Sequence, residues 1–332
     1  MQVSVIIPTF NRASVLRKTL QGYAEQSGDH QICEVLVVDD GSKDDTASVA
    51  KEWNDSPLLR VRYLKQENRG LSAARNHGIR EAKGELLLFG DDDIIPSSKM
   101  VAEHLAWHRK HPEPNFGVLG LVNWAAEINA TPFMVWSGLY GPQFNFGFFK
   151  PGMELDFRYA YFCNTSVKAS FLAQHGVFNE AFRYGGKTYG WEDLELSYRL
   201  CTNGYRLLYN PEAVGYHYKF ETFENTRRRV EMLYSTWPIF AKTEAAKRFL
   251  ELWRATHTAK TKSALRRVVK PLKSVVMALI RPLVDTRVPL PHRLYDMVFY
   301  HYVTPFSNYV DRAGDPKASE THPEMAGALG PK

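Results

Sequence analysis

The sequence predicts an α/β fold in which a mainly parallel sheet carries helices on both faces. In the first third of the chain, short β-rich runs alternate with segments whose apolar residues recur at helical spacing. Such alternation is typical of parallel strands joined by helices. Polar and acidic residues follow directly on three of these runs, and ligands of such sheets bind outside the carboxyl ends of the strands. We therefore expect a binding site at one edge of the sheet.

The expected strands are short apolar runs bounded by polar or turn-forming residues. They cover Val3–Ile7, Val35–Val38, Val61–Leu64, Leu86–Phe89 and Val118–Val122. Apolar residues at helical spacing predict a helix after each of the first four strands. The first of these helices begins after Ser14. The other three run from Asp45 to Trp53, from Leu71 to about Ala82, and from Met100 to Trp107.

The middle of the chain is less regular. Between Asn123 and Phe178, aromatic residues, Gly and Pro are frequent and periodicity is weak. This composition predicts a loop-rich apolar layer under the sheet, from which some aromatic rings could stack on a sugar.

Length and composition are those of a globular enzyme or binding protein. The 332 residues suffice for one large domain with appendages or for two modest domains, and 44% of them are hydrophobic. Cys33, Cys163 and Cys201 are scattered without metal-binding spacing, which is typical of a reducing compartment. The chain enters its first strand without a basic leader, and no apolar window reaches the roughly 18 residues of a spanning helix. We expect a cytoplasmic protein.

The positive charge is concentrated near the C-terminus. Between Ala241 and Leu290 there are twelve Lys or Arg and three Asp or Glu, a net charge of +9, against +6 for the whole chain. The rest of the chain therefore sums to −3. This distribution argues against nucleic acid as a partner of the whole protein.

Three consecutive aspartates follow the fourth expected strand. Asp91, Asp92 and Asp93 would repel one another at the mouth of a buried strand unless a cation lay between them. Carboxylate oxygens suit Mg²⁺ or Mn²⁺, which often carry a polyphosphate. A solvated acidic turn is the alternative interpretation. The polar residues Thr9–Asn11 and the pair Asp39–Asp40, which end two other strands, favour the cation.

A second acidic motif begins a helix further along the chain. Glu192 and Asp193 precede apolar residues at helical spacing that continue to about Thr202, so both lie in the first turn, where the helix dipole favours carboxylates. An ordinary capping pair would have the same pattern. The glycines at positions 185, 186 and 190 suit a loop that closes on a substrate.

Taken together, these motifs resemble the family 2 glycosyltransferases, which are inverting enzymes of the GT-A fold that use nucleotide-sugar donors. The resemblance covers roughly residues 1–220. It rests on ordered segments at residues 3–12, 34–46, 68–76, 91–93, 164–180 and 190–193. The expected fold class is therefore GT-A, a Rossmann-like arrangement, with an additional helical region at the C-terminus.

The resemblance also implies roles for individual residues. It assigns Pro8, Thr9, Asn11 and Asp40 to the nucleobase and ribose, where a carboxylate such as Asp40 can accept a hydrogen bond from uracil. It assigns Arg75 to a phosphate, Asp91 to the ribose and Asp92 to a supporting role. Asp93 would ligate Mg²⁺ or Mn²⁺ between the two phosphates, with Asp91 and His217 as further candidate ligands. Asp193 would be the catalytic base, with Glu192 as its close competitor.

The function implied is a metal-dependent inverting glycosyltransferase. It would move a sugar from a nucleoside-diphosphate donor, expected to be a UDP-sugar, to a hydroxyl of a glycan or lipid-linked acceptor in cell-surface polysaccharide or lipopolysaccharide synthesis. Residues 226–230 read Thr-Arg-Arg-Arg-Val where processive members have Gln-x-x-Arg-Trp, so we expect transfer of one or a few sugars.

Two other functions stay open. A sugar-nucleotide nucleotidyltransferase would share the nucleotide-binding half, although the Gly-rich phosphate loop of such enzymes is missing after the first strand. A catalytically inactive binding or scaffold protein would share the whole fold. The intact carboxylates Asp91, Asp93 and Asp193 argue against this second alternative.

The expected domains are a catalytic domain at residues 1–225, a basic and partly amphipathic helical region at 226–310, and a disordered tail at 311–332. Between Leu265 and Val284, apolar residues form a helical stripe beside Arg266, Arg267, Lys270, Lys273 and Arg281. A stripe of this kind can lie on an anionic membrane, here the inner face, or pack on the catalytic domain. Both interpretations stay open.

Overall fold

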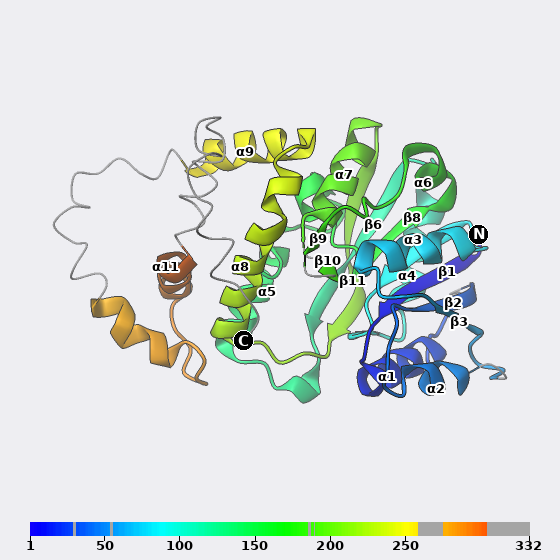
Figure 1. Ribbon diagram of the computed structural model, residues 1–332, viewed down its shortest axis with the longest axis horizontal. Coiled ribbons are helices and arrows are strands. Elements are labelled where there is room, and N and C mark those ends of the chain that lie inside the picture. Colours follow the sequence, from blue (N-terminus) through cyan, green and yellow to red (C-terminus); the bar gives the residue numbers. More distant parts are fainter. Residues whose placement is uncertain (29–30, 54–55, 185–186, 189, 258–274, 304–332) are drawn as a thin grey trace.

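The computed structural model describes residues 1–28, 31–53, 56–184, 187–188, 190–257 and 275–303. A nine-stranded mixed sheet runs through the molecule, with helices on both faces (Figure 1). Its principal strand order is β3-β2-β1-β4-β8-β6-β11-β5, and β7 pairs with β11. The α/β class predicted from the sequence is confirmed.

The strands in chain order are β1 (Val3–Thr9), β2 (Ile32–Asp39), β3 (Val61–Lys65), β4 (Leu86–Gly90), β5 (Ile94–Pro96), β6 (Phe116–Trp124), β7 (Glu154–Leu155), β8 (Asn164–Lys168) and β11 (Arg206–His217). The short strands β9 (Arg183–Tyr184) and β10 (Lys187–Thr188) form a separate hairpin. All five predicted strands are present. The apolar run of β4 is fully buried, as expected for a central strand covered on both faces.

The four strands β1 to β4 pair in parallel, as the alternation of strands and helices predicts. The next neighbour, β8, runs antiparallel to both β4 and β6. The predicted fifth strand, β6, is therefore separated from β4, and its parallel partner is β11. The sheet is mixed because β8 enters between its two parallel parts and because β5 and β7 pair antiparallel with β11.

The helices are α1 (Ala13–Ala24), α2 (Thr46–Lys51), α3 (Leu71–Glu81), α4 (Met100–Lys110), α5 (Pro132–Leu139), α6 (Ala169–His175), α7 (Glu192–Thr202), α8 (Phe223–Phe240), α9 (Glu244–His257) and α11 (His292–Val303). One apolar core joins α1, α2 and α4 to one face of the sheet, and another joins α3, α6 and α7 to the opposite face. Short 3-10 helices lie at η1 (Ala126–Ile128), η2 (Phe146–Phe148), η3 (Phe157–Tyr159) and η5 (Arg281–Leu283). Within the described ranges, no helix is both long and apolar enough to cross a bilayer.

The last described helix, α11, packs beside α5 and α8 (Figure 1). Their core contains Phe133 and Trp136 of α5, Phe223 of α8 and the inner face of α11. The predicted boundary at residue 225 falls inside α8, so this helix joins the two predicted regions. The predicted tail at 311–332 lies outside the described residues.

Only the end of the predicted amphipathic stripe, residues 275–284, is described. Met277 and Val284 are buried in the core around α5, and Ile280 packs against it. Val276, Leu279 and Leu283 remain exposed, and Leu279 exposes 70% of its surface. This part of the stripe therefore packs on the domain and also presents an apolar outer face.

The sheet brings the predicted site residues to one edge. Thr9 of β1 lies opposite Asp39 of β2, and β4 ends at Gly90, directly before Asp91. Because β8 runs antiparallel, its first residue, Asn164, lies opposite Gly90. His217 ends β11 and lies opposite Ile94 of β5, so it reaches the same edge from the other half of the sheet.

Candidate active site

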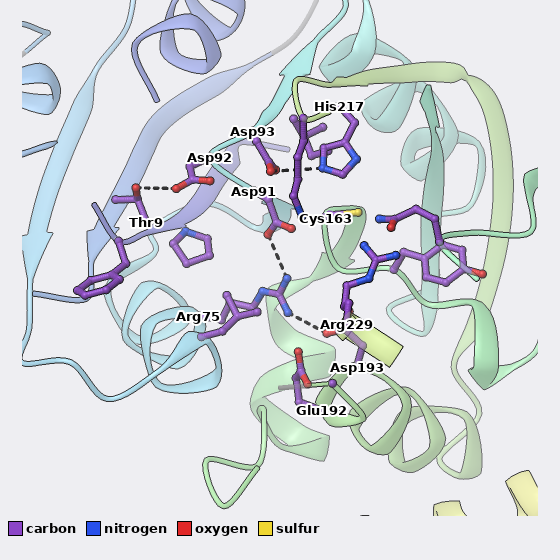
Figure 2. Close-up of a pocket in the computed structure, with 18 of the residues that line it drawn as sticks. Thr9, Arg75, Asp91, Asp92, Asp93, Cys163, Glu192, Asp193, His217 and Arg229 are labelled. Carbon is purple, nitrogen blue, oxygen red and sulfur yellow. Dashed lines mark hydrogen bonds and ion pairs between the residues drawn. The ribbon is translucent and has the colours of Figure 1, made fainter. Parts of the chain in front are cut away.

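A cavity of about 620 Å³ opens at this edge of the sheet (Figure 2). The predicted site residues that line it are Pro8, Thr9, Asp40, Arg75, Asp91, Asp92, Asp93, Glu192, Asp193 and His217. Asn11 is the predicted site residue that does not line it. It adopts a left-handed turn with φ of 53°, and its side-chain oxygen accepts a hydrogen bond from the Lys43 amide at 2.8 Å. Its observed role is therefore to hold a turn beside the cavity.

Asp40 is buried and firmly positioned. Its carboxylate accepts hydrogen bonds from the Gln66 side chain at 2.8 Å and from the backbone amides of Arg69 and Gly70 at 2.7 and 2.8 Å. Gly70 has φ of 89°, a conformation that favours glycine and turns its amide toward this carboxylate before α3 begins. Asp40 thus places a fixed acceptor at the cavity wall.

Arg75 connects two parts of the site. Its guanidinium is buried and bonds Asp91 at 3.1 Å, Asp193 at 2.8 Å and the Phe162 carbonyl at 3.1 Å (Figure 2). Two carboxylates and a carbonyl use the terminal donors of Arg75, while its buried Nε has no hydrogen-bond partner among the described residues, so the expected contact with a phosphate stays a prediction. The carboxylate of Asp91 is paired with Arg75, and its expected role as a metal ligand also stays a prediction.

Glu192 and Asp193 begin α7, as predicted. The residue before them, Trp191, has φ of 66°, which is unfavourable for a bulky side chain. Tertiary packing holds this conformation: the Trp191 ring stacks on Phe240 at 4.6 Å between centroids, and its indole N–H donates to the Leu233 carbonyl. Packing against α8 therefore fixes the start of α7 and the direction of both carboxylates.

The two carboxylates have different surroundings. Burial and the neighbouring Asp193 raise the pKa of Glu192 to about 7, and one of its buried oxygens has no hydrogen-bond partner among the described residues. Burial also raises the pKa of Asp193, but Arg75 and the Phe162 amide stabilise its charged form. Asp193 is therefore the carboxylate of the pair whose charge a buried cation compensates, and its pKa lies above its ordinary value.

Asp92 and Asp93 share one cation, Arg12. Its guanidinium lies 3.0 Å from Asp92 and 2.8 Å from Asp93, and Thr9 donates a hydrogen bond to Asp92. Burial raises the pKa of Asp92 to about 7. Burial also opposes the charge on Asp93, but His217 and Arg12 outweigh it and lower the pKa of Asp93 below its ordinary value. Asp93 is thus the carboxylate of the pair that keeps its negative charge.

The residues fit a divalent cation that is held partly by its substrate. The Asp93 carboxylate lies 3.3 Å from His217 Nε2, so an oxygen and an imidazole nitrogen converge on the cavity (Figure 2). In the part of the chain that the structure describes, no three His, Cys, Asp or Glu come close enough to hold an ion alone. Mg²⁺ commonly has one or two protein ligands and completes its shell with water and phosphate oxygens.

Sequence reasoning missed several residues that line the cavity: Arg12, Gln143, Phe144, Tyr161, Cys163, Lys219 and Arg229. The buried carboxylate of Glu221 pairs with Lys219 at 2.5 Å and lies 3.7 Å from Arg229, so two cationic residues are held at one wall. Arg12 and Arg229 lie in segments that the sequence analysis singled out without giving them a role. Gln143, Phe144 and Tyr161 carried no signal beyond their aromatic-rich surroundings.

Residues 4–122 match the sequence profile of glycosyl transferase family 2. These residues form a family 2 glycosyltransferase domain. A relative, validoxylamine A glucosyltransferase of Streptomyces hygroscopicus subsp. jinggangensis, is 31% identical over 236 residues, which cover 64% of the chain and 54% of that protein. The family 2 chain thus spans about half the length of this relative.

Solved structures confirm the GT-A fold. Mannosyltransferase PcManGT from Pyrobaculum calidifontis, solved with GDP-Man and Mn²⁺, has a TM-score of 0.57 at 19% identity over 94% of this chain and 88% of that one. Residues 1–349 of S. aureus TarS give a TM-score of 0.53 at 19% identity, over 93% and 92% of the two chains. At this identity the likeness concerns the fold alone.

Proposed function

We propose that this family 2 protein is a metal-dependent inverting glycosyltransferase that moves a sugar from a nucleoside-diphosphate donor to a hydroxyl of a glycan or lipid-linked acceptor. The observation that carries the proposal is the Asp91–Arg75–Asp193 bridge, which links the expected donor carboxylates to a base in one cavity. A screen of nucleotide release from UDP-, GDP- and dTDP-sugars tests it. Release from none of these donors, with acceptor glycans present, would contradict transfer.

The proposed chemistry is a single in-line displacement. The acceptor hydroxyl forms a bond to the anomeric carbon while the bond from this carbon to the diphosphate oxygen breaks, through an oxocarbenium-like transition state. Asp193 takes the proton of the hydroxyl, and the electron pair of the broken bond leaves with the nucleoside diphosphate. Arg75 keeps Asp193 ionised and aligned from 2.8 Å.

The leaving diphosphate requires charge neutralisation. Asp93 and His217 would hold Mg²⁺ or Mn²⁺, and the bound ion would act as a Lewis acid toward the phosphate oxygens. Lys219 and Arg229 add positive charge to the same cavity. PcManGT, which has the same fold, was solved with Mn²⁺, and this supports the proposal that the present protein uses a metal. A UDP-sugar is the proposed donor, because Asp40 suits the N3–H of uracil.

The proposal also includes how many sugars are transferred, in which pathway, and where in the cell. We infer non-processive transfer, in cell-surface polysaccharide or lipopolysaccharide synthesis, by a protein at the cytoplasmic side of a membrane. The nucleotidyltransferase alternative is less well supported, because its acceptor, a sugar phosphate, is already ionised and needs no carboxylate base such as Asp193 in the cavity. An inactive scaffold is less well supported because the buried carboxylates are costly to retain without chemistry.

Replacement of Asp40 by Ala is expected to weaken UDP binding by about 1–3 kcal/mol, the cost of an unmade hydrogen bond to a charged group, and to raise the donor KM. Calorimetry with UDP measures this change. Asp44→Ala is the matched control, because Asp44 is a nearby carboxylate that holds the Ala13 and Thr46 amides and does not line the cavity. Equal UDP affinity of the Asp40→Ala and unmodified proteins would place the nucleobase elsewhere.

The basic region supports binding to an anionic membrane. Four of its charges, Arg266, Arg267, Lys270 and Lys273, lie outside the described residues, and the exposed Val276, Leu279 and Leu283 follow them in the chain. Basic charge next to exposed apolar side chains is the pattern of segments that lie at a bilayer surface.

Replacing Arg266 and Arg267 by Gln is expected to weaken binding to anionic vesicles by about 2 kcal/mol, at about 1 kcal/mol per charge. Sedimentation with phosphatidylserine vesicles measures the change. Lys247→Gln with Arg248→Gln is the matched control, because these two exposed cations lie on α9 outside the stripe and pair with acidic neighbours. Equal loss in both double variants, or no sedimentation of the unmodified protein, would refute a membrane role for the stripe.

A further inference from the structure

Arg12 pairs with both Asp92 and the expected metal ligand Asp93. One guanidinium nitrogen lies 2.8 Å from Asp93 Oδ2, and the other lies 3.0 Å from Asp92 Oδ1. The same Asp93 oxygen lies 3.3 Å from His217 Nε2. A cation bound by Asp93 and His217 would therefore share its oxygen ligand with a guanidinium. Two positive charges at such close range in a buried site repel each other strongly.

The surroundings of Arg12 allow it to move. It is the residue directly before α1, and its side chain is 38% exposed, whereas Asp92 and Asp93 are 5% and 7% exposed. The carboxylates are thus fixed at the end of β4, and the guanidinium reaches them from the solvent side. Arg12 also lines the cavity, so a guanidinium released from Asp93 stays near any bound diphosphate.

We propose that Arg12 is a built-in counter-cation that holds Asp92 and Asp93 until a divalent metal arrives together with a nucleoside diphosphate. This inference rests on the proposed metal-dependent function. Free metal must displace Arg12 from Asp93 without compensation, so it binds weakly. A metal–nucleotide complex supplies phosphate oxygens that accept hydrogen bonds from the displaced guanidinium, so the complex binds to the site more tightly than the free metal does. Metal and nucleotide are consequently coupled, and the coupling factor is the same in both directions.

The test is the binding of Mn²⁺ alone, measured from the electron paramagnetic resonance signal of free Mn²⁺, with and without saturating UDP. The unmodified protein should bind Mn²⁺ weakly alone and at least about tenfold more tightly with UDP. Arg12→Gln should bind Mn²⁺ alone about tenfold more tightly than the unmodified protein and gain less from UDP. Arg12→Lys keeps the charge and should retain most of the coupling.

Arg17→Gln is the matched control, because Arg17 lies on α1, the helix that follows Arg12, and pairs with Glu52 outside the cavity. It should behave as the unmodified protein does. Thermal unfolding establishes that each variant is folded, and Arg12→Lys keeps the test valid if Arg12→Gln does not fold.

Two outcomes separate this inference from the proposed function. If all variants bind Mn²⁺ equally and UDP changes nothing, the role of Arg12 is refuted while the metal site stands. If UDP binds but no protein binds Mn²⁺ with or without it, the metal dependence of the proposed function is refuted together with the role of Arg12.

Discussion

Replacement of Asp193 by Asn is expected to lower kcat about a hundredfold to ten-thousandfold, the usual contribution of general-base catalysis. Asn keeps the shape of the side chain and can still accept the hydrogen bond from Arg75, but it cannot take a proton from the acceptor. UDP binding should therefore stay nearly unchanged. The measurement is nucleotide release from the donor and acceptor that the screen identifies, with calorimetry of UDP in parallel.

Glu192→Gln is the matched control for this variant, because Glu192 is the preceding residue and lines the same cavity. Its pKa of about 7 leaves it partly protonated at neutral pH, so an uncharged amide resembles one of its existing states. We expect a smaller loss than in Asp193→Asn. A dead Glu192→Gln beside an active Asp193→Asn would mean that the two roles are exchanged.

The pH dependence follows from the same assignment. A base must be ionised to accept a proton, so kcat should fall as the pH decreases through the pKa of Asp193. Burial raises this pKa above the ordinary range of an aspartate, and Arg75 limits the increase. The acid limb of the pH profile should therefore lie above pH 4, the ordinary pKa of an aspartate being about 3.9.

The sequence was sufficient for the parts of the fold that local pattern determines. The apolar runs of β1, β2 and β4, and the polar residues that follow them, predicted both the sheet and its functional edge. The segment that begins at Asn164 was singled out by its resemblance to the family, but the antiparallel place of the five-residue strand β8 between β4 and β6 depends on pairing across the sheet. No periodicity in the five residues carries this information.

The partners of the charged side chains could not be predicted from the sequence either. Arg75 lies 118 positions from Asp193, and Arg12 lies 81 positions from Asp93, so only the folded chain shows that each pair meets. The resemblance gave Arg75 to a phosphate because the residue type suits that ligand. The structure shows that the same guanidinium suits two carboxylates equally well.

The C-terminal stripe illustrates a different limit. Sequence pattern left membrane binding and domain packing open because an apolar stripe beside basic residues suits either surface. Met277 and Val284 face the core around α5, whereas Leu279 faces solvent. The aromatic residues of α5, Phe133 and Trp136, decide which side is buried, and they come from a distant part of the chain.

Replacement of Asp93 by Asn is expected to lower turnover about a thousandfold while the fold survives, because a Lewis acid contributes several kcal/mol to the charge developing on the leaving phosphate. Asp93 keeps its charge, since His217 and Arg12 lower its pKa against the effect of burial. The neutral amide lacks this charge and binds a hard cation poorly. Turnover is measured across a titration of Mn²⁺, since a weakened site should need more metal.

Asp92→Asn is the matched control at the adjacent position. Burial raises the pKa of Asp92 to about 7, so this carboxyl group is already partly neutral at physiological pH, and the amide imitates its protonated form. The control should lose little turnover, whereas a metal-independent mechanism predicts similar small losses in both variants. Full activity of the unmodified protein in excess chelator would also refute metal dependence. A large loss confined to Asp93→Asn and relieved by added Mn²⁺ would identify Asp93 as the metal ligand, because charge at Asp92 is then shown to be dispensable.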